Sequence, residues 1–300
     1  MRRLVVCMAL GSVAAVLVLG ASCSAEVPEE DGDGLGVVVT ILPQAEFVTQ
    51  TGGENVNVSV MIPPGASPHT YEPSPSQMTT LAAADMYAKV GSGLEFELVW
   101  MDKLTAANKD MLVVDCSEGI ELLPMDEEQH SAADGPHSGR MDPHIWMSPL
   151  NAMTMVRNIC AGLTELDPQR VDLYERNRDR YVRTLSELDA EIRQTLANTG
   201  TRAFMVYHPS FGYFAHEYGL TMIPIEEEGK EPTPAALKSL IGEAEERNIQ
   251  VIFASPQFNP QTARVIADAI GARVVFVDPL ARDYVENLRE FLHQLVEASE

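Results

Sequence analysis

Four side chains that lie far apart in the sequence share one local setting, in which an apolar run ends and a loop with proline begins. They are His69, His144, His208 and Asp278. In an open parallel sheet, ligands bind beyond the carboxyl ends of the strands, so residues at such positions can converge on one site. Three imidazoles and a carboxylate form a tetrahedral set suited to zinc, whereas manganese prefers more oxygen ligands. Since a bound imidazole must be neutral, metal binding is expected to fail below about pH 6.5.

Taken singly, these residues and their neighbours also have ordinary explanations. A histidine beside a proline is often a turn or capping residue, and aspartate before proline commonly forms a turn. His216 falls on the face of an expected helix, and His293 lies in an amphipathic segment near the C-terminus. The acidic triplet 226–228 is followed by glycine and is interpreted as a solvated loop. The metal hypothesis therefore depends on the joint pattern of the four residues.

The elements that would position these residues alternate along the chain. Short apolar runs and helical stretches succeed one another from Leu35 onward, which predicts parallel sheets covered by helices. The expected strands are 37–42, 56–62, 86–90 and 111–114 in the first half and 203–207, 220–225, 251–254 and 274–277 in the second. The sequence thus predicts two α/β lobes of similar architecture.

A different segment separates the two halves. Asp167 is a suitable N-cap and Pro168 fits the first helical position, and neither glycine nor proline follows until after Ala197. Some thirty residues at 1.5 Å each give roughly 45 Å of helix. A two-helix hairpin is the alternative, although the segment lacks turn residues. We expect one long rigid helix over 167–199 that joins a lobe of 35–166 to a lobe of 200–300, with the metal site in the interlobe cleft.

The first 23 residues are organised like a signal peptide. Arg2 and Arg3 precede an apolar stretch over 4–19, and small residues lead to Cys23. Cys23 would carry the lipid of an exported lipoprotein; ordinary cleavage that releases a periplasmic protein is the alternative. Residues 24–34 are acidic and rich in glycine, as expected of a flexible tether. An extracytoplasmic location follows in either case.

Composition argues against one class of partner and allows a disulfide without requiring it. The chain has 44 acidic and 21 basic residues and a net charge of -23, which argues against nucleic acid as a partner. Cys116 and Cys160 are the cysteines outside the signal segment. An exported protein permits a disulfide between them, and two free buried thiols are the alternative.

Five segments together resemble the zinc- and manganese-binding solute-binding proteins of ABC importers. The segments are Pro63–Pro75, Ala84–Glu95, Asp142–Pro149, Tyr207–Phe214 and Val277–Leu280. The resemblance covers nearly all of 35–300 and implies two α/β lobes joined by one long helix. It also implies that His69, His144, His208 and Asp278 are the metal ligands. The histidine at 208 resembles the zinc-type members, since manganese-type members tend to have glutamate there.

The sequence departs from this family pattern in two places. Zinc-type members often carry a histidine-rich acidic loop before the second ligand, whereas 125–140 holds only His130 and His137. A metal-collecting role and a plain solvated loop both remain open for this segment. Ser255 stands where many members have glutamate, so a contact to the site is expected to be different or missing.

The resemblance implies a monomeric, exported binding protein that captures a divalent metal and delivers it to an ABC permease. Zn2+ is the expected cargo and Mn2+ the alternative. An exported zinc hydrolase would fit if Asp278 were a general base, but the sequence has no His-Glu-x-x-His spacing. A surface adhesin of the same fold is a further alternative. The long helix should resist bending, so we expect only small lobe motions.

Overall fold

The computed structural model describes residues 34–125, 141–226 and 229–297. The predicted signal peptide and tether, Cys23 and the two histidines of 125–140 lie outside these ranges. Gly34–Glu300 forms one compact unit. Within the described ranges, no helix combines the length and the apolar character needed to cross a membrane.

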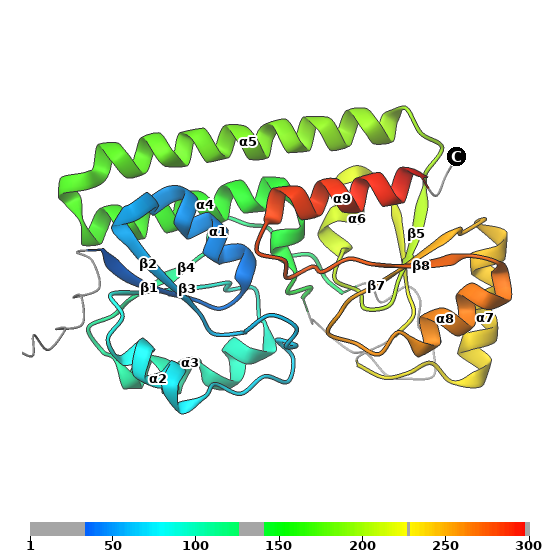
Figure 1. Cartoon of the computed structure of the whole chain (residues 1–300), viewed down its shortest axis with the longest axis horizontal. Helices are drawn as coiled ribbons and strands as arrows, with labels where there is room; N and C mark the ends of the chain where they lie inside the picture. The colour runs from blue at the N-terminus through cyan, green and yellow to red at the C-terminus, as the bar shows by residue number, and fades with distance from the viewer. Residues whose placement is uncertain (1–33, 126–140, 227–228, 298–300) are drawn as a thin grey trace, which may run out of the picture. The chain divides into compact units, whose positions relative to one another are not determined.

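Two four-stranded parallel sheets form the centres of two α/β lobes, as predicted (Figure 1). The first contains β1 (Leu35–Val39), β2 (Val56–Val60), β3 (Met86–Lys89) and β4 (Leu112–Asp115) in the order β2-β1-β3-β4. The second contains β5 (Ala203–Val206), β6 (Thr221–Pro224), β7 (Val251–Ala254) and β8 (Arg273–Phe276) in the order β6-β5-β7-β8. Both sheets therefore reverse their strand order beside their first strand, where ligands of open parallel sheets bind.

Helices cover both faces of each sheet (Figure 1). Those of the first lobe are α1 (Leu42–Gly52), α2 (Pro75–Ala82), α3 (Glu95–Ala107) and α4 (Pro149–Leu166). Those of the second are α6 (Gly212–Tyr218), α7 (Pro234–Glu246), α8 (Gln261–Ile270) and α9 (Tyr284–Glu297). Strand alternation separates the two faces: Phe204 and Val206 join the core that contains α9, whereas Met205 joins the core that contains α8.

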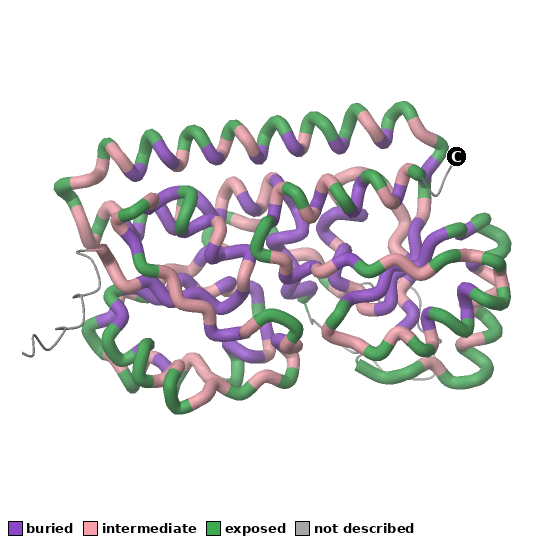
Figure 2. Tube along the Cα trace, viewed as in Figure 1, coloured by how far each residue is buried: buried purple, intermediate pink, exposed green. Residues whose placement is uncertain are grey.

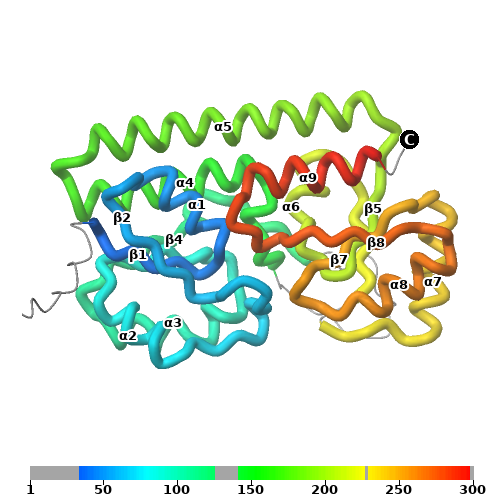
Figure 3. The backbone as a smooth tube through the Cα atoms, viewed as in Figure 1, coloured from blue at the N-terminus to red at the C-terminus, as the bar shows by residue number. Residues whose placement is uncertain are grey.

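The long helix is α5 (Val171–Ala197), and its 27 residues span about 40 Å. It runs beside α4 and α1 of the first lobe and beside α9 of the second (Figure 3). Its buried side chains form one stripe, which comprises Tyr174, Asn177, Tyr181, Leu185, Leu188, Ile192 and Leu196. Asp167 makes no cap bond to the backbone of the helix that follows; its Oδ2 instead accepts hydrogen bonds from Arg170 and Tyr174. The intervening Pro168–Arg170 is a 3-10 turn.

The core beside α5 is continuous from one lobe to the other (Figure 2). The ring of Phe47 on α1 lies 5.0 Å from the ring of Tyr284 on α9, edge to face. Glu46 accepts a hydrogen bond from the Tyr181 hydroxyl on α5 at 2.7 Å and another from the Tyr284 backbone. Burial raises the pKa of the Glu46 carboxyl. The lobes are therefore joined by buried contacts as well as by the helix.

Cys116 and Cys160 are both buried, and both are free thiols. Cys116 accepts a hydrogen bond from the Gln44 amide at 3.5 Å. Burial raises the pKa of the Cys116 thiol well above its ordinary range, so this thiol remains protonated. Of the two alternatives for these cysteines, the structure contains the free thiols.

We expect metal loading to leave the arrangement of the lobes almost unchanged. Wide closure would bend α5 and separate the rings of Phe47 and Tyr284, which breaks backbone hydrogen bonds and exposes apolar surface. Small-angle scattering of chelator-treated and zinc-loaded protein should therefore give superimposable curves. A clear decrease in the radius of gyration on loading would contradict this expectation.

Candidate metal centre

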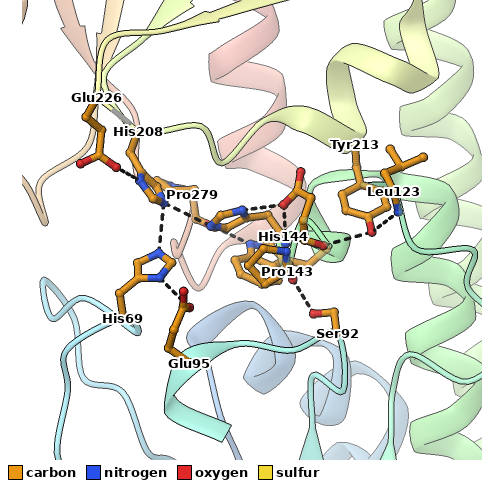
Figure 4. A network of polar contacts seen from close by, with 12 residues as sticks. His69, Ser92, Glu95, Leu123, Pro143, His144, His208, Tyr213, Glu226 and Pro279 are labelled. Atoms are coloured by element: carbon orange, nitrogen blue, oxygen red, sulfur yellow. Dashed lines mark hydrogen bonds and ion pairs between the residues drawn. The ribbon is translucent and has the colours of Figure 1, made fainter. Parts of the chain in front are cut away.

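Three imidazole rings from both lobes meet at one point (Figure 4). The Nε2 atom of His208 lies 3.1 Å from that of His69 and 3.3 Å from that of His144. Each ring offers one ligand atom, and the three atoms all lie within 4.8 Å of one another. One cation between the rings would be within coordination distance of three nitrogen ligands.

A carboxylate holds the other nitrogen of each ring. The Nδ1 atoms contact Glu95 at 2.7 Å, Asp142 at 2.7 Å and Glu226 at 2.5 Å for His69, His144 and His208 respectively. An ionised carboxylate only accepts hydrogen bonds, so we assign the proton of each neutral ring to Nδ1. The lone pairs of all three Nε2 atoms then face one another. Such carboxylate–histidine pairs are the usual outer contacts of a metal-bound histidine.

His69 is placed by a loop that is tied to the start of α3. Its backbone N–H donates to Ser67 Oγ at 3.3 Å, and the N–H of Phe96 donates to the carbonyl of Pro68 at 3.2 Å. Glu95, the first residue of α3, supplies the carboxylate. The side chain of His69 is 22% exposed, whereas those of His144 and His208 are 3% and 11% exposed. His69 is thus the ring that solvent reaches most easily.

Glu97 fixes the start of α3 from within the first lobe. Its buried carboxylate accepts the backbone N–H groups of Val90 at 2.6 Å and Gly91 at 2.8 Å, just beyond β3, and the hydroxyl of Thr40 beyond β1. Burial raises the pKa of this carboxyl, while these hydrogen bonds lower it. The bonds join α3 to the strand ends, and this orients Glu95 toward His69.

His144 is held by its own loop and by a helix of the other lobe. Asp142 Oδ1 accepts both the backbone N–H of His144 at 2.9 Å and its ring nitrogen. Tyr213 of α6 donates its hydroxyl to the Asp142 carbonyl at 3.1 Å. A Cβ at Gly212, the first residue of α6, would come within 2.2 Å of Asp142 Oδ2. Only glycine therefore allows this close approach of α6 to the carboxylate.

His208 lies two residues beyond the end of β5, and its ring is electrostatically perturbed. Burial lowers the pKa of His208 to about 4, the hydrogen bond to Glu226 raises it, and the neighbouring rings lower it further. The ring of Phe258 stacks on His208 at 4.7 Å. His208 is consequently neutral at physiological pH and can donate its lone pair to a metal.

The interpretation of 226–228 as a solvated loop is wrong for Glu226, which is 3% exposed and bonded to His208. Glu227 and Glu228 lie outside the described residues. The signal for Glu226 was available, because it follows an apolar run at the end of β6, the same setting that identified the histidines. Ser255, where a carboxylate contact was expected to differ, is buried beyond β7. In this chain, a carboxylate that follows a different strand contacts His208.

Asp278 is not part of the group formed by the three rings. Its Oδ1 accepts hydrogen bonds from Gln257 Nε2 at 2.7 Å and from the Leu280 backbone at 2.9 Å. The next residue, Pro279, accepts a bond from Trp146, whose ring lies 5.3 Å from that of His144. Asp278 is therefore linked to the centre through Pro279 and Trp146, and its role as a fourth ligand stays a prediction. Trp146 both contacts a ring of the centre and is fully buried.

Comparison with known proteins connects this geometry to a family. Residues 37–298 match the family model described as zinc-uptake complex component A, periplasmic (ZnuA). The high-affinity zinc uptake system protein ZnuA of Bacillus subtilis is 33% identical over 282 residues, which cover 89% of this chain and 86% of that protein. The manganese-binding lipoprotein MntA of Halalkalibacterium halodurans is 28% identical over 265 residues, which cover 86% and 84%. A crystal structure of ZnuA matches with a TM-score of 0.83 and 40% identity, covering 89% of this chain and all of that one.

The low pKa of His208 should make the metal-free protein less stable in acid. Between pH 6.5 and about 4 the unfolded chain binds a proton at this ring that the folded chain does not, so stability decreases as the pH falls. Relative to His208→Gln, the wild type should lose about 1.4 kcal/mol of unfolding free energy per pH unit over this interval. Urea unfolding of chelator-treated proteins at pH 7, 6 and 5 measures the difference. Parallel pH curves for the two proteins would contradict the assignment.

Proposed function

The chain belongs to the family of periplasmic zinc-uptake component A proteins, and from that membership we propose that it captures Zn2+ outside the cytoplasm and delivers it to the permease of an ABC importer. The observation that carries the proposal is the convergence of the Nε2 atoms of His69, His144 and His208. Elemental analysis of protein purified without added metal, together with competitive zinc and manganese titrations, tests it directly.

The donor atoms favour zinc as the cargo. Three neutral imidazoles with one carboxylate suit a tetrahedral Zn2+ site, while Mn2+ prefers a larger share of oxygen. The relatives named above include both a zinc uptake protein and a manganese-binding lipoprotein, so kinship supports the class of metal and the donor set supports zinc. We propose His69, His144, His208 and Asp278 as the ligands, with Mn2+ as the alternative cargo.

Capture and delivery would begin at His69. Its side chain is the most exposed of the three rings, and its partner Glu95 is 26% exposed. The carboxylates behind the other two rings are far less accessible, with 9% of Asp142 and 3% of Glu226 exposed. An ion would therefore meet His69 first on entry and leave it last on release. Lipid attachment at Cys23 and a monomeric state remain predictions.

The hydrolase alternative has less support from the geometry. A catalytic zinc keeps an open position and needs a general base near the bound water. Glu95, Asp142 and Glu226 each accept the Nδ1 proton of a ring, so they are engaged in orienting ligands. Asp278 would have to serve as the base through Oδ2, since its Oδ1 already accepts two N–H groups.

Removal of single rings tests the ligand assignment. His69→Ala and His208→Ala should each reduce zinc affinity by more than the 10- to 100-fold that typically follows loss of an outer contact. Competition against a calibrated chelator measures the affinity. His293→Ala is the matched control, because this histidine lies on α9 with 62% of its side chain exposed. Unchanged zinc affinity in His69→Ala and His208→Ala would remove the basis of the transport proposal. It would favour a role that does not depend on metal binding at this site, such as adhesion.

The carboxylate behind His69 provides a milder test. Glu95→Gln keeps the shape of the side chain but removes the charge that holds the Nδ1 proton, so zinc affinity should fall by about 10- to 100-fold. Glu191→Gln, an exposed change on α5, is the control. Equal zinc affinity in Glu95→Gln and the control would show that the contact does not support metal binding.

A further inference from the structure

The two oxygens of the Asp278 carboxylate differ in the hydrogen bonds that they accept. Oδ1 accepts the side-chain N–H of Gln257 at 2.7 Å and the backbone N–H of Leu280 at 2.9 Å. Within the described part of the chain, no hydrogen bond to Oδ2 is found. Two donors approximately saturate the lone pairs of one carboxylate oxygen. Oδ2 is therefore the oxygen that remains able to bind another group.

The Gln257 amide has only one favourable orientation. Its Oε1 is buried without a hydrogen-bond partner among the described residues, which is ordinarily destabilising. Rotating the amide by half a turn would place Oε1 against Asp278 Oδ1, so that two acceptors would face each other. The charge-assisted bond from Nε2 to the carboxylate offsets the orphaned oxygen. The structure thus tolerates an unsatisfied oxygen on Gln257 in order to form the bond to Asp278. This indicates that the orientation of the Asp278 carboxylate is important.

Gln257 and Asp278 are connected to the rings of the centre through their neighbours in the sequence, since Pro279 accepts a bond from Trp146, whose ring contacts His144. Gln257 follows β7 and precedes Phe258, whose ring stacks on His208. Asn287 of α9 donates its side-chain N–H to the Asp278 carbonyl at 2.8 Å, which fixes the backbone of this loop. Gln257 then determines which carboxylate oxygen stays free.

Building on the proposed function, we propose that Gln257 is a specificity-determining positioning residue that restricts Asp278 to coordination through one oxygen. With one oxygen and three imidazole nitrogens, the cargo ion has four protein ligands, the arrangement zinc prefers. A carboxylate free to bind through both oxygens would add a fifth ligand atom and favour manganese, which takes more oxygen. The hydrogen bond from Gln257 thus sets the relative affinity for zinc and manganese, although Gln257 contacts neither ion.

Gln257→Met tests the inference, since methionine matches glutamine in length but donates no hydrogen bond. The ratio of zinc to manganese affinity should fall by about tenfold, chiefly because manganese binds more tightly. Cobalt-loaded protein gives an independent readout, because four-coordinate cobalt absorbs visible light far more strongly than five-coordinate cobalt. The wild type should show the intense spectrum and Gln257→Met a weaker one. Asn287→Leu loses a bond to the Asp278 backbone and should change both affinities by the same factor.

The outcomes separate this inference from the proposed function. An unchanged affinity ratio and an unchanged cobalt spectrum in Gln257→Met would overturn the role of Gln257, and so would an equal loss of both metals. If His208→Ala still loses zinc in that case, the transport proposal stands without the inference. If His208→Ala retains full zinc affinity, the proposed function itself fails, and the inference fails with it.

Discussion

The unprotonated Nε2 of His208 lies 3.1 Å from that of His69 and 3.3 Å from that of His144, and such lone pairs repel one another unless a cation lies between them. The rest of the molecule maintains this unfavourable arrangement. Each ring is kept in its tautomer and orientation by a carboxylate, and each carboxylate is fixed in turn. Glu97 anchors the helix that carries Glu95, Tyr213 binds the loop of Asp142, and Glu226 is buried against His208. A divalent ion would relieve the repulsion, so affinity at the proposed site would arise from an arrangement built in advance of its ligand.

The shared core explains how rings from two lobes can stay so close. Phe47, Tyr181 and Tyr284 bring together α1, α5 and α9, and Glu46 joins the last two through hydrogen bonds. This cluster is connected to the centre through Trp146. The Tyr284 hydroxyl donates to the backbone carbonyl of Trp146, and the Trp146 ring contacts His144. Packing between the lobes therefore contributes to the geometry of the candidate metal centre as well as to stability.

Much of this architecture could be predicted from the sequence, because hydrophobic periodicity and strand-end positions are local signals. The two lobes and the long helix follow from such patterns, and so does the convergence of three histidines. The strand-end position of Glu226 was also a local signal, but which carboxylate contacts which ring could not be predicted in the same way. Glu226 reaches His208 only because β6 lies beside β5, and this adjacency is a property of the sheet order. The role proposed for Gln257 likewise depends on the pairing of β7 with β8, which brings two loops together.

The continuity of the core has a kinetic consequence. If the lobes are held at a fixed separation by apolar contacts, an arriving ion does not wait for a hinge to close, and its capture is limited by diffusion and by the loss of its own water shell. Differences in affinity between metals would then appear mainly in how slowly each one leaves, as is usual for related complexes at a preformed site. Under the proposed function, a receptor built this way would collect ions quickly and would need its recipient to help release them.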